Sequence, residues 1–256
     1  MKRAIRYALN HLSRPTLQRA AKVAMPVVDL FYRGSRYECP VCGQRFRKML
    51  PYGYVVQRPN ALCPHCMALE RHRLLWLYIV RETDLLTVPH RMLHIAPESC
   101  FIGRLRKAMG NNYVTADLES PLADVKMNIE QMPFADEEFD VVFCNHILEH
   151  VDDDRCAIAE LYRVMRPGSW GVVLSPVNPS RTTTYEDPTI VSPEARREAF
   201  GQPDHLRDYG TDFADRLREG GFRVDQIDYF ARLTTAEQLR YALRPETIYV
   251  VKKTGA

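Results

Sequence analysis

Four cysteines near the amino-terminal end of the sequence have the spacing of metal ligands. Cys39 and Cys42 form one C-x-x-C pair, and Cys63 and Cys66 form a second pair after twenty intervening residues. Two such pairs at this separation predict a tetrahedral zinc site to which each pair supplies two thiolates. Because four thiolates leave the ion no open position, the predicted metal is structural rather than catalytic.

The residues between the two pairs are too few to build a hydrophobic core, so the metal would supply the folding free energy. Redox-active dithiols or free cysteines are the alternatives, and the paired spacing disfavours both. His65 lies inside the second pair and is predicted not to be a ligand. Zinc modules of this kind often bind nucleic acid, but this loop lacks a dense basic and aromatic array, which favours a packing role.

A second group of polar residues follows a strand that the sequence predicts to be buried. Residues 139–144 are mostly apolar, and Asn145 and His146 come directly after them. Apolar residues then recur at helical spacing through residues 157–165, Pro167-Gly168 stops that helix, and a second apolar strand begins at Trp170. This is a strand–helix–strand crossover with polar residues at the carboxyl end of its first strand, where such folds bind ligands.

The same stretch carries a family resemblance. The runs MPFADEEFDVVFCNHILEHVDDD and ELYRVMRPGSWGVV resemble the central motifs of class I S-adenosylmethionine-dependent methyltransferases, in particular the small-molecule branch with an H-x-L-E-H segment after its fourth strand. The resemblance covers residues 91–253. It implies an α/β fold with a Rossmann-like, mostly parallel sheet of seven strands, and the last two strands are expected to form an antiparallel edge.

The resemblance also implies a site for S-adenosylmethionine. In the family, the turn after the first strand is rich in glycine, whereas this sequence has Ala96, Glu98 and Cys100 at those places. Two interpretations follow. In the first, which we favour because Asp117 is in place further on, the turn has a different shape and Glu98 holds the ammonium group of the cofactor. In the second, cofactor binding is weakened or lost.

Further cofactor residues follow from the same comparison. Asp117 ends the second strand about twenty residues after the turn, where an acidic side chain accepts hydrogen bonds from ribose hydroxyls. A turn or cap aspartate is the structural alternative for this position. The full set implied for the cofactor is His94, Ala96, Glu98, Asp117, Leu118, Asn128, Ile129 and Asn145, with Asn128 and Ile129 beside the adenine.

Three side chains are candidates for the catalytic base or for positioning the substrate. They are His146, His205 and Tyr209. Imidazole titrates near neutral pH, which suits His146 to the transfer of a substrate proton, and a structural role for it is equally open. The other two lie in or beside the long polar segment 176–210, which we interpret as a lid or substrate loop. Glu149 and His150 are predicted to be structural.

The sequence predicts four successive parts. These are a basic helical segment at 1–37, the zinc ribbon at 38–68, a connecting helix within 69–90 and the methyltransferase domain at 91–256. Residues 1–81 contain 15 Lys or Arg against 3 Asp or Glu, whereas the rest contain 20 against 29. The excess of positive charge in residues 1–81 suits an anionic partner, such as nucleic acid or a membrane surface that residues 1–37 would contact. It equally suits electrostatic attraction between the two halves of the chain.

Together these patterns predict an enzyme that transfers a methyl group to an O, N or C atom of a small metabolite or a sugar-containing intermediate. One alternative is an RNA methyltransferase that uses the basic half, and another is a non-catalytic protein whose cofactor site has degenerated. No run of eighteen apolar residues and no signal-peptide pattern is found, so we expect a cytoplasmic protein. Seven cysteines, an odd number, argue against a disulfide framework.

Overall fold

The structure is a computed structural model that describes residues 27–53 and 56–255. The chain forms two compact units. The first, here called the amino-terminal unit, contains the described residues up to Asp84 together with 99–103 and 229–246. The second, here called the sheet unit, contains 85–98, 104–228 and the residues from Thr247 onward. Since residues 229–246 belong to the amino-terminal unit, the grouping differs from the predicted division, in which 91–256 formed one domain.

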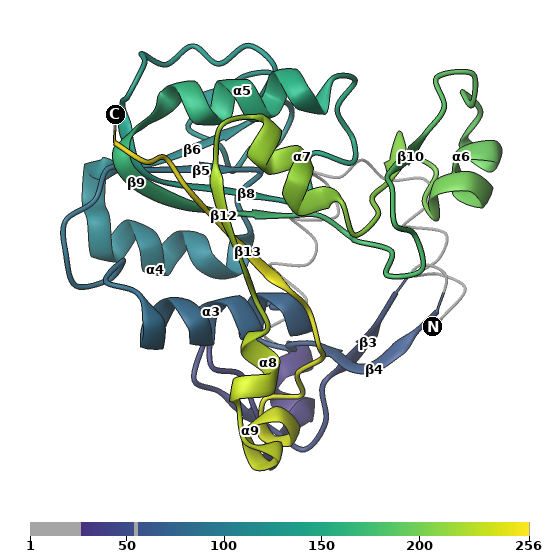
Figure 1. Ribbon diagram of the computed structural model, residues 1–256. Coiled ribbons are helices and arrows are strands. Elements are labelled where there is room, and N and C mark those ends of the chain that lie inside the picture. The colour runs from purple at the N-terminus through teal and green to yellow at the C-terminus, as the bar shows by residue number, and fades with distance from the viewer. Residues whose placement is uncertain (1–26, 54–55, 256) are drawn as a thin grey trace. The chain divides into compact units, whose positions relative to one another are not determined.

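A seven-stranded sheet is the centre of the sheet unit (Figure 1). Its strands are β5 (Met92–Ile95), β6 (Tyr113–Asp117), β7 (Val125–Lys126), β8 (Phe139–Asn145), β9 (Met165–Leu174), β12 (Arg223–Ile227) and β13 (Ile248–Lys252). Their spatial order is β12-β13-β9-β8-β5-β6-β7. All neighbours pair in parallel except β13, which is antiparallel to both β9 and β12. The predicted Rossmann-like sheet of class I methyltransferases is therefore confirmed.

Helices cover both faces of this sheet (Figure 1). Helix α5 (Asp154–Val164) and helix α7 (Phe213–Glu219) lie on one face, and residues 104–109 of α4 (Ser99–Met109) lie on the other. A short 3₁₀ turn, η1 (Gly110–Asn112), joins α4 to β6. The Asp153 side chain caps α5 by accepting a hydrogen bond from the backbone N–H of Cys156 at 3.0 Å.

The α5 helix ends earlier than its apolar pattern predicts. Strand β9 begins at Met165 rather than at Trp170, because the chain turns into extended backbone directly after Val164. Apolar residues at the end of a helix and at the start of a buried strand look alike in sequence, so periodicity cannot separate them.

The segment 176–210 contains regular structure of its own. Strands β10 (Tyr185–Glu186) and β11 (Arg207–Asp208) pair antiparallel, and helix α6 (Pro193–Phe200) lies between them in sequence. Two buried arginines hold this segment to α5 and α7. Arg207 of the segment lies 3.9 Å from Asp154 of α5, and Arg216 of α7 lies 2.9 Å from Glu186 of the segment. The segment is therefore anchored by buried charge pairs, which rarely occur in an unstructured loop.

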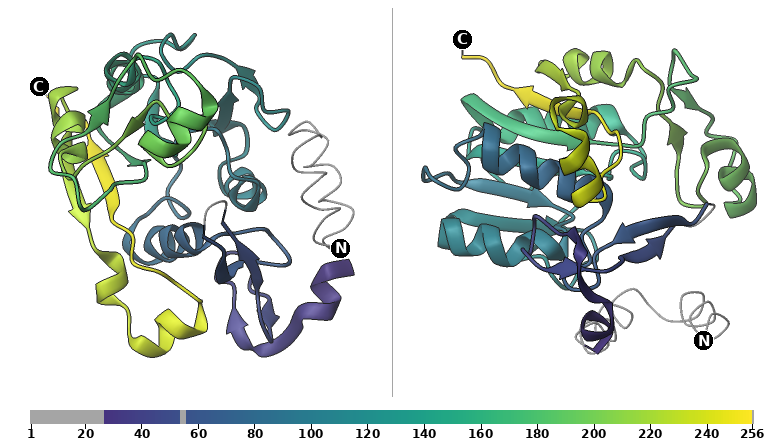
Figure 2. Two further views of the ribbon diagram at one scale, coloured as in Figure 1. Left: turned by 90° about the vertical axis from the view of Figure 1, so that its right-hand side faces the viewer. Right: turned by 90° about the horizontal axis from the view of Figure 1, so that it is seen from below.

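The amino-terminal unit is built from short elements (Figure 2). They are β1 (Arg33–Glu38), β2 (Arg45–Phe46), β3 (Leu50–Tyr52), β4 (Arg58–Leu62), α3 (Glu70–Glu82), α8 (Tyr229–Arg232) and α9 (Thr235–Arg240). Helix α3 falls inside the predicted connecting segment 69–90. The predicted apolar stripe of Ile5, Leu9 and Leu12 lies outside the described residues, and none of the described helices is long and apolar enough to cross a membrane.

Arg73 is the central side chain of the amino-terminal unit. It is fully buried, and its guanidinium donates hydrogen bonds to backbone carbonyl oxygens from three separate segments. The acceptors are Asn60, Ala61, Ala68, Tyr241 and Ala242, at 2.7–3.2 Å. A buried charge is stable only when its hydrogen-bonding groups are satisfied, and this set of carbonyls meets that condition.

The burial of β8 leads to a test of the sheet. Val142 is fully buried in β8, whereas Val191 is 68% exposed in the same unit. We expect Val142→Ala to lower the free energy of unfolding by about 1.5–3 kcal/mol, because it removes buried methyl groups and leaves a cavity. The matched change Val191→Ala is expected to alter it by no more than about 0.5 kcal/mol. Chemical denaturation monitored by circular dichroism measures both, and equal effects would contradict the burial assigned to β8.

Candidate functional site

The polar residues of the sheet unit gather at the carboxyl ends of β5 and β8. These two strands are neighbours, yet the chain leaves β5 to form β6 on one side and returns to place β8 on the other. A reversal of this kind opens a crevice outside the strand ends, because the two connections run in opposite directions. The predicted residues Ala96, Glu98, Asn145 and His146 all follow these two strand ends.

A chain of hydrogen bonds fixes the Glu98 carboxylate at this point. His94 is fully buried in β5, and its Nε2 lies 2.5 Å from Oε2 of Glu98. Because a carboxylate only accepts, His94 carries a proton on Nε2, and its Nδ1 lies 2.7 Å from the hydroxyl of Tyr113. The Nδ2 amide of Asn145 donates to the other oxygen of Glu98 at 3.0 Å. Glu98 is therefore held as an oriented anion.

Asn145 ends β8 with a buried acceptor. Its side chain is 6% exposed, and within the described chain its Oδ1 accepts no hydrogen bond. A buried polar atom without a partner costs free energy, and in native structures it commonly marks a place that a ligand or water fills. Oδ1 lies on the same amide as the Nδ2 that binds Glu98, so an acceptor and an anion stand side by side.

The turn after β5 contains no glycine, yet its backbone has a conformation that glycine favours. Ala96 has a φ of +48°, in the left-handed region, and its N–H donates to the carbonyl of Ala116 at 2.9 Å. A side chain with a Cβ is strained there by about 1–2 kcal/mol. We expected a turn of different shape from the glycine-rich turn of the family. At Ala96, however, the backbone has the left-handed conformation that glycine favours.

Asp117 stands at the end of β6 and forms a tight turn. Its Oδ1 accepts the backbone N–H groups of Glu119 at 2.7 Å and Ser120 at 2.6 Å. Oδ2 takes no part in this turn and can accept a hydroxyl. Leu118, the next residue, is 57% exposed. The structural and the ligand-binding interpretations of Asp117 are therefore compatible, since each uses a different oxygen.

The two residues proposed for the adenine differ in their surroundings. Ile129 is buried. Asn128 is exposed, and its amide both donates to the Glu130 carboxylate and accepts from the Glu130 backbone N–H, each at 3.0 Å. Asn128 is thus engaged with its own loop.

The loop after β8 brings His146 onto a buried carboxylate. His146 has a φ of +56°, and its Nδ1 lies 3.4 Å from Oε1 of Glu149, whose other oxygen accepts from the hydroxyl of Ser175 at 2.8 Å. Burial acts to raise the pKa of Glu149, but the contact with His146 outweighs it and leaves the pKa below its usual value. Glu149 is therefore an anion that orients the His146 ring.

His205 approaches the same carboxylate from the 176–210 segment. It is 5% exposed, and its ring packs against that of His150 with centroids 4.9 Å apart. Burial lowers the pKa of His205, so the neutral imidazole is the dominant form at neutral pH. Sequence reasoning treated Glu149 and His150 as structural; that His205 lies beside them depends on the fold of a distant segment.

Tyr209 occupies a different place from the two histidines. It is 1% exposed, and its hydroxyl donates to Asp154 at 2.5 Å while lying 3.1 Å from the Leu148 carbonyl. Burial, with the charge of Asp154, raises the pKa of Tyr209 far above its usual value. A phenol in these surroundings supports the fold and does not give up its proton, so we leave Tyr209 out of the site.

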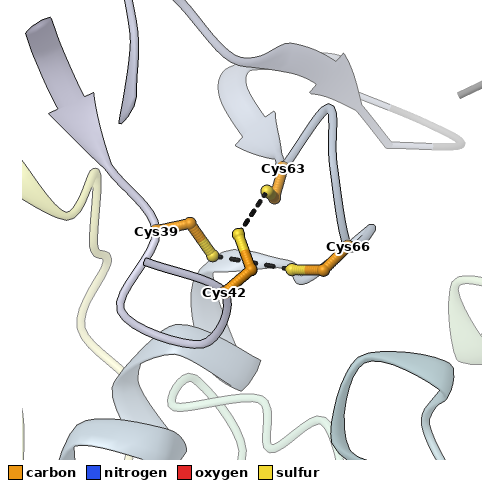
Figure 3. Close-up of side chains that lie close together, drawn as sticks. All are labelled: Cys39, Cys42, Cys63 and Cys66. Atoms are coloured by element: carbon orange, nitrogen blue, oxygen red, sulfur yellow. Dashed lines mark hydrogen bonds between the residues drawn. The ribbon is translucent and has the colours of Figure 1, made fainter. Parts of the chain in front are cut away.

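The four cysteines of the amino-terminal unit converge as the sequence predicts (Figure 3). The sulfur atoms of Cys39 and Cys66 are 3.6 Å apart, and those of Cys42 and Cys63 are 3.8 Å apart. Four sulfurs at about 2.3 Å from a tetrahedral zinc ion would be separated by about 3.8 Å. The donor set and its spacing therefore fit zinc.

A buried cation lies near these cysteines. Burial lowers the pKa of the Arg73 guanidinium, while the sulfurs of Cys39 and Cys63 and the carboxylate of Glu70 act in the opposite direction. A metal bound by four thiolates carries net negative charge, which is costly to bury without compensation. Arg73, which lies in the same unit, would compensate the charge of such a site.

The strand order and the crevice define the class of this protein: the sheet unit has the class I methyltransferase fold. Residues 93–173 match the sequence profile of a family described as "Methyltransferase domain". This stretch contains β8 and most of β5 and β9, together with Ala96, Glu98, Asn145 and His146. Residues 93–173 are thus similar to that family.

Curated relatives match parts of the chain. It is 38% identical over 55 residues to the ubiquinone/menaquinone biosynthesis C-methyltransferase UbiE of Desulfotalea psychrophila, which is 22% of each protein. It is 34% identical over 100 residues to the O-methyltransferase resE of Aspergillus sclerotiorum, which is 38% of this chain and 34% of that one. An uncharacterized protein of Escherichia coli, YafE, is 27% identical over 126 residues, 45% of this chain and 58% of the relative. The chain therefore spans less than two thirds of each relative.

Solved structures that are similar to this chain have low sequence identity to it. The YcgJ protein of a Bacillus species is 15% identical, with a TM-score of 0.48 over 72% of this chain and 100% of that one. The [4+2]-cyclase SpnF is also 15% identical, with a TM-score of 0.49 over 93% of this chain and 97% of the other.

The left-handed Ala96 generates a test of the turn. We expect Ala96→Gly to leave stability unchanged or raise it by up to about 1 kcal/mol, because relief of backbone strain offsets the greater freedom of glycine in the unfolded chain. The control Ala108→Gly, at an exposed position in α4, is expected to lower stability by about 1 kcal/mol. Thermal unfolding of both variants measures the difference, and a marked loss for Ala96→Gly contradicts the assigned backbone conformation.

Proposed function

We propose that this protein is an S-adenosylmethionine-dependent methyltransferase that acts on an O, N or C nucleophile of a small metabolite or a sugar-containing molecule. The observation that carries the proposal is the buried Oδ1 of Asn145, an acceptor without a partner in the described chain, beside the oriented carboxylate of Glu98. An ammonium group is the ligand that such a pair favours, because it has three donors and a positive charge.

The remaining crevice residues suit the other parts of the cofactor. The Oδ2 of Asp117 would accept a hydrogen bond from the ribose, and the apolar side chains of Leu118 and Ile129 would contact the adenine. When bound, the cofactor supplies an electrophilic methyl group on a sulfonium centre, so the protein has chiefly to align the acceptor and remove its proton.

His146 is the proposed proton acceptor. Its side chain is 18% exposed, and the Glu149 anion would stabilise the imidazolium that forms when the proton arrives. His205 is the second candidate for this role, since its neutral ring lies beside the same carboxylate. The polar segment 176–210 would contact the substrate.

We also propose that Cys39, Cys42, Cys63 and Cys66 hold a structural zinc ion. Support comes from the separations of their sulfurs and from the buried Arg73 charge. In this role the metal joins the two C-x-x-C turns, and the stability of the amino-terminal unit depends on it.

Calorimetric titration with S-adenosylmethionine tests the cofactor site directly. We expect micromolar binding by the zinc-loaded protein. Asp117→Ala and Asn145→Ala are each expected to weaken it by about tenfold or more, because each removes a hydrogen-bonding partner of the ligand. The control Asp215→Ala, which removes an exposed carboxylate on α7, should leave the dissociation constant unchanged.

Absence of binding by folded wild-type protein would contradict the enzyme proposal and favour a non-catalytic binding protein. If the cofactor binds, methyl transfer to small-molecule acceptors is compared with transfer to RNA at increasing salt. Methylation of RNA with a steep loss of binding as salt rises would favour the RNA alternative.

The zinc proposal is tested through the cysteines. In cobalt-substituted protein we expect thiolate-to-metal charge-transfer absorption, which Cys63→Ser should reduce and Cys156→Ser should leave unchanged, because Cys156 is exposed outside the cluster. We also expect chelation to lower the melting temperature of wild-type protein. An unchanged spectrum in the Cys63→Ser variant overturns the assignment.

A further inference from the structure

Three ligand-type side chains meet in the sheet unit, apart from the cysteine cluster. Glu149, His150 and His205 each offer one atom, and these atoms all lie within 4.8 Å of one another. Among the described residues, this trio and the four cysteines are the groups of three or more such side chains that could hold a metal ion.

The chemistry of the trio differs from that of the cysteines. Two imidazoles and one carboxylate form a common ligand set for divalent transition metals that keep open positions, whereas four thiolates close the coordination sphere. Three atoms that each lie about 2.1 Å from one tetrahedral ion are about 3.4 Å apart. The three ligand atoms would therefore need to approach one another by up to about 1.4 Å, which side-chain rotations can supply.

The His150 ring is already oriented for such a role. Its Nδ1 lies 3.0 Å from the backbone carbonyl oxygen of Asp204. A carbonyl only accepts, so Nδ1 carries the proton and Nε2 keeps its lone pair in the neutral ring. Metal-binding histidines commonly have this arrangement, in which one nitrogen donates to a carbonyl and the other is left for the ion. The His150 side chain is 34% exposed, which leaves a path for the ion and for further ligands.

The backbone around the trio is held firmly. The N–H of Leu206 donates to the Glu149 carbonyl at 2.8 Å. Arg207 joins the same two segments, since its buried guanidinium donates to the carbonyls of Leu148, Val151 and Asp152 at 2.6–2.9 Å. Together with the hydrogen bond from Ser175 to Glu149, these contacts supply the outer support that a metal site needs.

We propose that Glu149, His150 and His205 bind a divalent transition-metal ion with open coordination positions. These positions suit oxygen donors, so the ion would bind a hydroxyl or carboxylate of the methyl acceptor and lower the pKa of a bound hydroxyl. In this arrangement His205 is a ligand, and the proton acceptor is His146. The identity of the acceptor group rests on the proposed function, whereas the ion site does not.

Metal content tests the site without any assay of activity. Protein saturated with zinc and then dialysed is expected to contain about two zinc ions per chain, one in each ligand set. His150→Ala and His205→Ala are expected to contain about one. His90→Ala is the matched control, because His90 precedes β5 and so lies at the opposite end of the strand from the crevice. It should contain as much zinc as the wild type.

A second measurement identifies the ligands. Cobalt is titrated into protein whose cysteine cluster is filled with zinc, and we expect visible absorption without thiolate charge transfer. Ser175→Ala should weaken this binding about tenfold, because it loosens the Glu149 carboxylate. One zinc ion in the wild type, or the same content in all three histidine variants, overturns the proposal. Circular dichroism checks that each variant is folded. If the buried His205→Ala variant unfolds, His150→Ala still tests the site, because the His150 side chain is partly exposed.

S-adenosylmethionine titration separates this proposal from the previous one. Loss of the second zinc ion with intact cofactor binding in His150→Ala supports the metal site alone. If the protein contains two zinc ions but does not bind the cofactor, the proposed metal site is supported and the proposal that the ion binds a methyl acceptor is contradicted.

Discussion

The loop after β8 depends on one buried cation. The guanidinium of Arg207 in β11 donates to three backbone carbonyls of this loop, and its Nε donates to the carboxylate of Glu186. Removal of one partner from a buried network of this kind typically costs about 3–5 kcal/mol, because the other charges remain buried. The loop contains His146, Glu149 and His150, so Arg207 helps to fix the positions of these three side chains.

The turn after β5 contains no glycine, yet Ala96 has the left-handed backbone conformation that glycine favours. Two residues later, hydrogen bonds from His94 and Asn145 fix the Glu98 carboxylate. His94 and Tyr113 hold that charge from inside the sheet. A carboxylate placed in this way compensates a positive ligand by direct attraction, whereas a glycine-rich turn offers only oriented N–H groups.

The sequence was sufficient for features that depend on local pattern. The apolar run predicts the buried strand β8, and the spacing of the cysteines predicts that their sulfurs meet; the structure contains both. Features that depend on distant partners could not be found in this way. The residues next to Tyr209 in sequence do not reveal that its hydroxyl donates a hydrogen bond to Asp154. Likewise, the burial of Arg73 depends on backbone carbonyls from residues 241–242.

The five carbonyls around Arg73 also constrain the order in which the chain can fold. Two of them come from residues 168 and 169 positions later in the sequence, so the amino-terminal unit lacks part of its structure until nearly the whole chain is available. Closing so long a loop carries an entropic cost, which is smaller once the intervening residues are compact. The packing around Arg73 is therefore completed only after residues 241–242 have been synthesised.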